Sequence, residues 1–238
     1  MLDKELRDAL VTDERIDFPI IRHPLVISLY DGESMDEHLN ALLKWKNEQV
    51  QKAFAERGWR QFIWLHERPY RWDALALLVN ALTDRQWFEL MGMVWVDSEN
   101  LWQVQVRWFL RQKHGWARKW LGDADGATAV KALHPQMTVY RGCSKGNAIG
   151  WSWTLDHQKA EWFAKRFAFN GEEPTVLHGK IQRERIIAGI WSRGESEVIC
   201  DPLQVRVERV EKLDHRKENV NAEEGQEVPD RVAEGQRV

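Results

Sequence analysis

The sequence predicts an α+β protein with a helical first half, a β-rich second part and a polar C-terminal tail. From about residue 34 to residue 135, apolar side chains recur at the spacing of one face of a helix. From residue 136 they alternate along the chain and β-branched residues become frequent, as in strands. Residues 214–238 are polar and poor in apolar side chains, so we expect a disordered tail. We therefore divide the chain into a mainly helical region (1–135), a compact α+β core (136–213) and the tail.

Two capping boxes mark helix starts in the first half. Ser34 with Glu37, and Thr83 with Gln86, place two side chains so that each can bond the backbone N–H group of the other residue. The first box opens a helix that we expect to end near Gly58. The second box opens another helix with apolar residues along one face.

Three other segments of the first half give weaker signals. Residues 1–33 are mixed in character and contain two prolines, so we expect them to be extended or irregular. Residues 73–82 are rich in alanine and leucine and predict a short helix. A further helix is expected from about Ser98, because its apolar positions give way to basic residues just before Gly115.

The second part is expected to contain six strands around one helix. A glycine-rich loop, residues 142–150, follows the first strand. The helix is expected to begin after Thr154 or Asp156, either of which can cap it. The strands are expected at Met137–Arg141, Trp151–Thr154, Thr175–Ile181, Arg185–Ile190, Glu197–Cys200 and Leu203–Val210.

Composition and charge limit the classes of function. The formal net charge of −3 supplies no positive field for phosphates, so binding to nucleic acid is not supported. No apolar run is long enough to span a bilayer and the N-terminus has no signal-peptide core, so we expect a soluble, cytoplasmic protein without a membrane partner. Cys143 and Cys200 are too few for a disulfide framework, which suits a reducing compartment.

The histidines do not predict a metal site. His114, His134, His157 and His178 lack the spacing of metal ligands along the sequence. We expect surface or capping roles for them, and no metal cofactor.

Two carboxylates, Glu195 and Glu197, stand two residues apart at the start of an apolar run. On a strand they would share one face, about 7 Å apart. Two like charges this close are unfavourable unless a positive or hydroxyl group lies between them. We interpret them as facing a sugar in a cleft, with a solvated strand edge as the alternative.

Two features upstream fit the same interpretation. Arg141 ends a strand before Gly142, where its planar guanidinium can hold a phosphate; a surface ion pair is the alternative. Ser152 and Thr154 share one face of an extended segment and can present two hydroxyl groups to a cleft. An ordinary strand with a polar side is the alternative there.

In this order, the three features resemble the motifs of mono-ADP-ribosyltransferases of the Arg-Ser-Glu class, which include arginine-modifying toxins and vertebrate ectoenzymes. The matching motifs are Val139–Gly142, Trp151–Thr154 and Glu195–Glu197, and the resemblance covers roughly a third of the chain. The middle motif departs from the family in having Trp153 where threonine is usual and Thr154 where serine is common.

The resemblance implies a split β-sandwich with a cleft for NAD, which is the substrate, and no metal. Arg141 would contact the phosphates or a ribose of NAD, while Ser152 would bind the nicotinamide ribose and hold Glu197. Glu197 would bond the ribose 2′-hydroxyl and stabilise the oxocarbenium-like cation that forms as nicotinamide leaves. The residues implied to contact NAD are Tyr140, Arg141, Gly142, Ser152, Trp153, Thr154 and Glu197.

The resemblance also implies an acceptor. Family members that modify arginine usually carry glutamate at the position of Glu195, which would orient the guanidinium of a target protein, with Trp191 as an aromatic contact. The expected activity is transfer of ADP-ribose from NAD to a protein arginine, with release of nicotinamide, by a bacterial or phage effector. The alternatives are an NAD glycohydrolase, transfer to a nucleic-acid base or phosphate, and a catalytically silent binding module.

Overall fold

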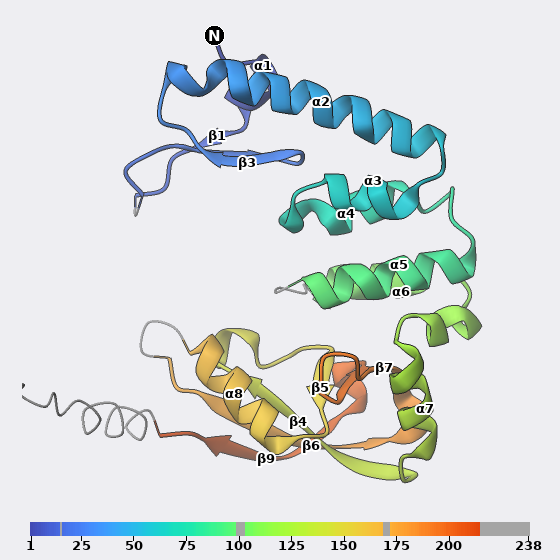
Figure 1. The fold of residues 1–238 in the computed structure, drawn as a ribbon. Helices are drawn as coiled ribbons and strands as arrows, with labels where there is room; N and C mark the ends of the chain where they lie inside the picture. The colour runs from blue at the N-terminus through green and yellow to red at the C-terminus, as the bar shows by residue number, and fades with distance from the viewer. Residues whose placement is uncertain (15, 99–102, 169–171, 215–238) are drawn as a thin grey trace, which may run out of the picture.

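The computed structural model describes residues 1–14, 16–98, 103–168 and 172–214 (Figure 1). A small sheet beside a long helix comes first, further helices follow, and a six-stranded antiparallel sheet completes an α+β architecture. The helices are α1 (Lys4–Asp8), α2 (Asp36–Ala55), α3 (Trp59–Leu65), α4 (Arg71–Leu77), α5 (Asp84–Asp97), α6 (Gln103–Arg111), α7 (Ala124–Ala132) and α8 (His157–Phe167). The strands are β1 (Leu10–Val11), β2 (Ile20–His23), β3 (Val26–Leu29), β4 (Gln136–Cys143), β5 (Ser152–Thr154), β6 (Thr175–Gln182), β7 (Ile186–Ile190), β8 (Glu197–Cys200) and β9 (Arg206–Lys212).

The N-terminal segment, expected to be extended or irregular, contains a three-stranded sheet. β1, β2 and β3 pair antiparallel in that order, and Pro24 lies in the turn between β2 and β3. Leu6, Ile21 and Leu39 are buried together between this sheet, α1 and α2. Because β2 and β3 have four residues each, their alternation is too short to separate a strand from a loop in the sequence.

One of the two predicted capping boxes is present. Thr83 accepts a hydrogen bond from the Gln86 N–H group and Gln86 bonds back to Thr83, which opens α5. The prediction for Ser34 is wrong, because a 3-10 turn over Glu33–Met35 runs directly into α2 and no side chain caps that helix. The N–H group of Asp36, the first of α2, bonds to the Glu33 carbonyl of that turn.

The other predicted helices of the first half differ at their ends. The helix expected at 73–82 is α4, which ends at Leu77. Ser98, where a further helix was expected to begin, closes α5 by donating its N–H group to the Trp95 carbonyl. α6 begins at Gln103, and residues 99–102 lie outside the described residues.

The second sheet contains the six predicted strands in the order β7-β8-β5-β4-β6-β9. The last strand begins later than expected, at Arg206, because Pro202–Gln204 form a 3-10 turn. β4 pairs with β6 along its whole length but with β5 at one residue pair, Tyr140 with Thr154. The sheet therefore has two three-stranded halves that are joined at one point.

α8 packs on this sheet over β4 (Figure 1). The side chain of Asp156 accepts two backbone N–H groups of the first turn, so Asp156 is the cap of the two that the sequence allowed. A Cβ atom at Gly142 would lie 1.9 Å from the Ala160 carbonyl oxygen, and only glycine allows the helix to approach this closely.

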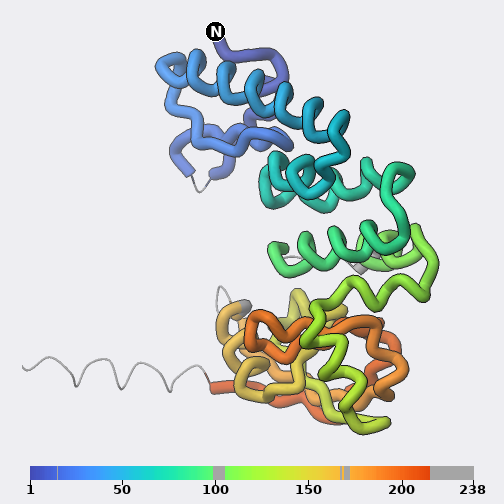
Figure 2. The backbone as a smooth tube through the Cα atoms, turned by 45° about the vertical axis from the view of Figure 1, so that its right-hand side comes forward, coloured from blue at the N-terminus to red at the C-terminus, as the bar shows by residue number. Residues whose placement is uncertain are grey.

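One hydrophobic core joins the helical region to the second sheet. Figure 2 shows the helical region above the part of the chain that contains this sheet. Trp87 and Met91 of α5 are buried in the same cluster as Trp151, Ile190 and Ile199 of the second part. The boundary that we placed at residue 135 therefore separates two types of secondary structure, and apolar packing continues across it.

The predicted C-terminal tail lies outside the described residues from residue 215 onward. Within the described ranges, no helix combines the length and the apolar character that a bilayer-spanning helix needs.

Candidate active site

A cavity of about 710 Å³ lies where the second sheet meets the C-terminal end of α5. Its size is in the range of small-molecule sites. Eight of the nine residues that the sequence analysis selected line it: Tyr140, Arg141, Gly142, Ser152, Trp153, Thr154, Glu195 and Glu197. Three motifs that are far apart along the chain thus meet at one cavity.

Glu197 is the buried carboxylate of this cavity. It begins β8, pairs with Thr154 of β5 across the sheet, and is only 6% exposed. Its Oε1 atom accepts hydrogen bonds from Ser152 Oγ at 2.5 Å and from Trp95 Nε1 at 3.0 Å. Burial raises the pKa of the Glu197 carboxyl, while these two donors favour the ionised form. The cavity wall therefore holds a carboxyl group in a fixed position, and burial and hydrogen bonding act on its pKa in opposite directions.

Trp95 is a residue of the candidate site that the sequence analysis did not select. It lies in α5 of the helical region, is 2% exposed, and packs edge to face on Trp72 with ring centroids 6.4 Å apart. In the sequence it continues the apolar face of a helix, where a tryptophan predicts core packing. The unusual tryptophan content of the first half is the one signal in the sequence, and it does not select this residue.

Arg141 lies on β4 with its guanidinium enclosed by backbone. Nη1 donates to the Ser152 carbonyl at 2.7 Å and Nη2 donates to the Asn147 carbonyl at 2.8 Å, while the buried Nε has no hydrogen-bond partner. Burial lowers the pKa of this guanidinium, and no carboxylate of the described residues forms an ion pair with it. A cation with neutral partners in a cavity wall is a favourable place for an anion such as a phosphate.

Gly150 makes room for that guanidinium. A Cβ atom at this position would lie 2.3 Å from Arg141 Cζ, so any other residue would displace the side chain. The glycine-rich loop before β5 therefore has a steric reason for its glycine at this point.

Glu195 also reaches the cavity, but not in the predicted way. Ser196 has φ of 46°, so the chain turns between the two glutamates and the regular strand starts at Glu197. The expectation that both share one strand face is therefore wrong. Glu195 forms an ion pair with Arg193 at 3.1 Å, and its carbonyl accepts a hydrogen bond from Thr154 Oγ1 at 2.6 Å.

Trp191 is the selected residue that the structure does not bring to the cavity. Its side chain packs against the apolar cluster around Val139 and Val130. Its backbone N–H group donates to Asp123 Oδ2 at 2.8 Å, which ties the segment after β7 to the start of α7.

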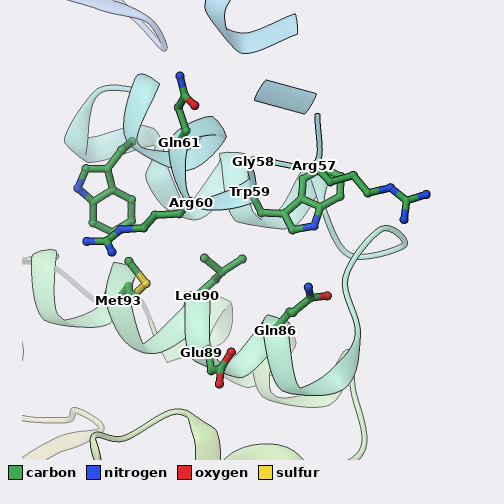
Figure 3. A pocket seen from close by; sticks show the side chains of 10 residues that line it. Arg57, Gly58, Trp59, Arg60, Gln61, Gln86, Glu89, Leu90 and Met93 are labelled. Carbon is green, nitrogen blue, oxygen red and sulfur yellow. The ribbon is translucent and has the colours of Figure 1, made fainter. Parts of the chain in front are cut away.

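A second cavity, of about 700 Å³, lies between the start of α3 and α5 (Figure 3). Trp59 and Arg60 face Gln86, Glu89 and Met93 across it. Its charged residues are exposed or half-buried, and none of them is a buried carboxylate. The chemical case for an active site therefore lies with the cavity around Glu197.

Comparison of the chain with protein-family models, with curated proteins and with solved structures found no match in any of the three.

Proposed function

We propose that this chain is an NAD-dependent mono-ADP-ribosyltransferase that transfers ADP-ribose to an arginine of a target protein and releases nicotinamide. The observation that carries the proposal is the buried carboxylate of Glu197, held by Ser152 and Trp95 in a cavity that also contains Arg141. The ordered motifs that resemble this family meet in the same place.

The chemical step needs a stabilised cation. As the bond between the ribose C1′ atom and nicotinamide breaks, the electron pair leaves with nicotinamide and positive charge develops on the ribose. A carboxylate already fixed by two donors stabilises this charge without reorganising, and its effect is strongest where water is excluded. Glu197 has both properties, since it is hydrogen-bonded and almost fully buried.

The position of NAD follows from Arg141. We infer that its guanidinium, which has no anionic partner among the described residues, meets the pyrophosphate, while Ser152 lies at the nicotinamide ribose. The single residue pair between β4 and β5 supports the split sheet that the family resemblance implies, with the cavity at the split.

Glu195 is suited to receive the acceptor arginine. Its carboxylate already pairs with a guanidinium, that of Arg193, at 3.1 Å. An arginine of a target protein would replace Arg193, give up a proton to Glu195, and attack C1′ through one nitrogen as the bond to nicotinamide breaks. The same ion pair favours a second candidate, an NAD glycohydrolase, because a Glu195 that stays occupied by Arg193 leaves water as the nucleophile.

The test is nicotinamide release from NAD by the full-length protein, with and without agmatine as an arginine mimic. We expect release and labelled agmatine from the wild type, and a loss of at least about 100-fold in Glu197→Gln. Glu184→Gln, on an exposed turn, is the matched control and keeps full activity. Rapid release without labelled agmatine selects the glycohydrolase.

Removing the competing guanidinium sharpens the choice between the two activities. Arg193→Gln frees Glu195, so we expect more labelled agmatine per nicotinamide released. No release by any variant, together with no thermal stabilisation by NAD, contradicts both activities and leaves a binding module.

A further inference from the structure

Three side chains from separate elements converge beside α8. His157 begins this helix, His178 lies on β6 and Glu211 lies on β9. Glu211 Oε2 is 3.0 Å from His157 Nε2 and 2.6 Å from His178 Nε2. One ligand atom from each residue lies within 4.8 Å of the other two. The sequence could not indicate this group, because the spacing of its members follows no local ligand motif.

The surroundings of His157 suit a metal ligand. Its Nδ1 atom lies 3.3 Å from Glu161 Oε1, one helical turn along α8. This carboxylate favours the tautomer with the proton on Nδ1, which leaves a lone pair on Nε2 that faces Glu211. A lone pair opposite a carboxylate oxygen needs a cation between them, either a proton or a metal ion. Ligating histidines characteristically have such a carboxylate at their other nitrogen.

The rings are oriented before any ion binds. Tyr140 packs edge to face on both imidazoles, with ring centroids 5.1 Å from each. Tyr140 and His178 are also direct partners in the pairing of β4 with β6. Two histidines held by a shared aromatic ring on regular elements lose little freedom when they bind an ion.

We propose that His157, His178 and Glu211 bind a divalent first-row metal ion of the zinc type. Two imidazoles and one carboxylate form a ligand set that zinc accepts, with a fourth position for water. The side chains are 32%, 16% and 22% exposed, so an ion can enter from solvent. Arg209 lies 3.7 Å from Glu211 Oε2, and the ion takes the place of this exposed guanidinium.

A metal at this position ties the last strand to the rest of the core. β9 is one of the two edge strands of the sheet and pairs with β6 alone. The three ligands connect it to α8 and β6, so binding stabilises the folded protein whatever happens at the NAD cavity.

The experiment measures zinc binding to the full-length protein after chelator treatment, by calorimetry and by thermal denaturation. We expect one zinc ion per chain and, at about 100 times the dissociation constant, a rise in Tm of about 5 to 10 °C, with magnesium giving none. His178→Gln weakens zinc binding by about 100-fold or more, and Glu161→Gln, which alters the second carboxylate, by about 10-fold.

His114→Gln is the matched control, because His114 pairs with Asp84 at 2.6 Å on the surface in the same kind of contact. This variant binds zinc as the wild type does. The proposal is overturned if the wild type binds no zinc, if His178→Gln binds as tightly as the wild type, or if His114→Gln loses binding equally. Glu211→Gln, which keeps the size of the side chain, separates lost binding from misfolding, because a folded variant without zinc affinity supports the site.

Discussion

Replacing Trp95 with phenylalanine tests whether the helical region takes part in the chemistry. The indole Nε1 atom donates to Glu197 Oε1 at 3.0 Å, from a position 102 residues earlier in the chain. Trp95→Phe keeps an aromatic ring in the core and removes this donor. Glu197 then keeps Ser152 as its remaining donor.

The magnitude follows from the type of hydrogen bond. A bond to a charged group contributes about 1.5 to 3 kcal/mol, which corresponds to a fall of about 10- to 100-fold in nicotinamide release. Because the Trp95 bond lowers the pKa of Glu197, its loss adds to the increase that burial causes. The acid limb of the pH–rate profile therefore moves to higher pH in Trp95→Phe, and the activity lost is partly recovered at alkaline pH.

The control is a second tryptophan of the same helix. Trp87 is fully buried and its Nε1 atom donates to the Phe109 carbonyl at 3.0 Å, so Trp87→Phe also removes one buried donor and some ring volume. It should lower Tm comparably but leave the acid limb in place. An unshifted acid limb in Trp95→Phe, or the same shift in both variants, would refute a direct role for Trp95.

Three further predictions concern charge and space. Glu197→Gln should be more stable than the wild type at pH 7 to 8 and equal to it below the unfolded pKa of about 4.5. Burial raises the folded pKa, so the wild type loses stability as pH rises from the unfolded pKa toward the folded pKa. Denaturant titrations at two pH values can measure the difference in the free energy of unfolding. Gly150→Ala should raise the KM for NAD about 10-fold with a smaller effect on kcat, because its methyl group displaces Arg141; unchanged steady-state kinetics would count against phosphate binding there. Burial alone would raise the pKa of Asp123, but hydrogen bonds from backbone N–H groups outweigh it and lower the pKa, so its contribution is present above about pH 3.8 and is lost as pH falls through the folded pKa. Asp123→Asn should therefore cost about 1 kcal/mol at neutral pH and nothing in acid, and equal losses at both pH values would contradict this origin.

The motifs of the second part could be predicted because they belong to strands with a clear two-residue alternation. Strand order then brings Arg141, Ser152 and Glu197 to one cavity. The geometry of the glutamate pair could not be predicted in the same way. A positive φ at Ser196 is unusual for a residue other than glycine, and the glycine that signals a turn, Gly194, stands before Glu195 and not between the two glutamates.

Contacts between elements that are distant in the sequence could not be predicted, for a different reason. Helical periodicity shows which face of a segment is buried but not what it is buried against. The sequence therefore gives no indication that the indole nitrogen of Trp95 reaches across to Glu197. His157 and His178 read as surface residues for the same reason, since their neighbour Glu211 comes from a third element.

The core shared by the helices and the sheet affects how the protein is made. The ribosome adds about 5 to 20 residues per second. Because Trp95 and Glu197 are 102 residues apart, α5 is synthesised about 5 to 20 s before the strand that carries Glu197. For the first part of this interval Trp87 and Met91 lack Trp151, and throughout it they lack Ile199, both of which later join the same buried cluster. A nascent chain therefore exposes an apolar, aromatic surface that chaperones can bind until the last strands are synthesised. A chain that terminates early keeps this surface exposed and is a substrate for degradation.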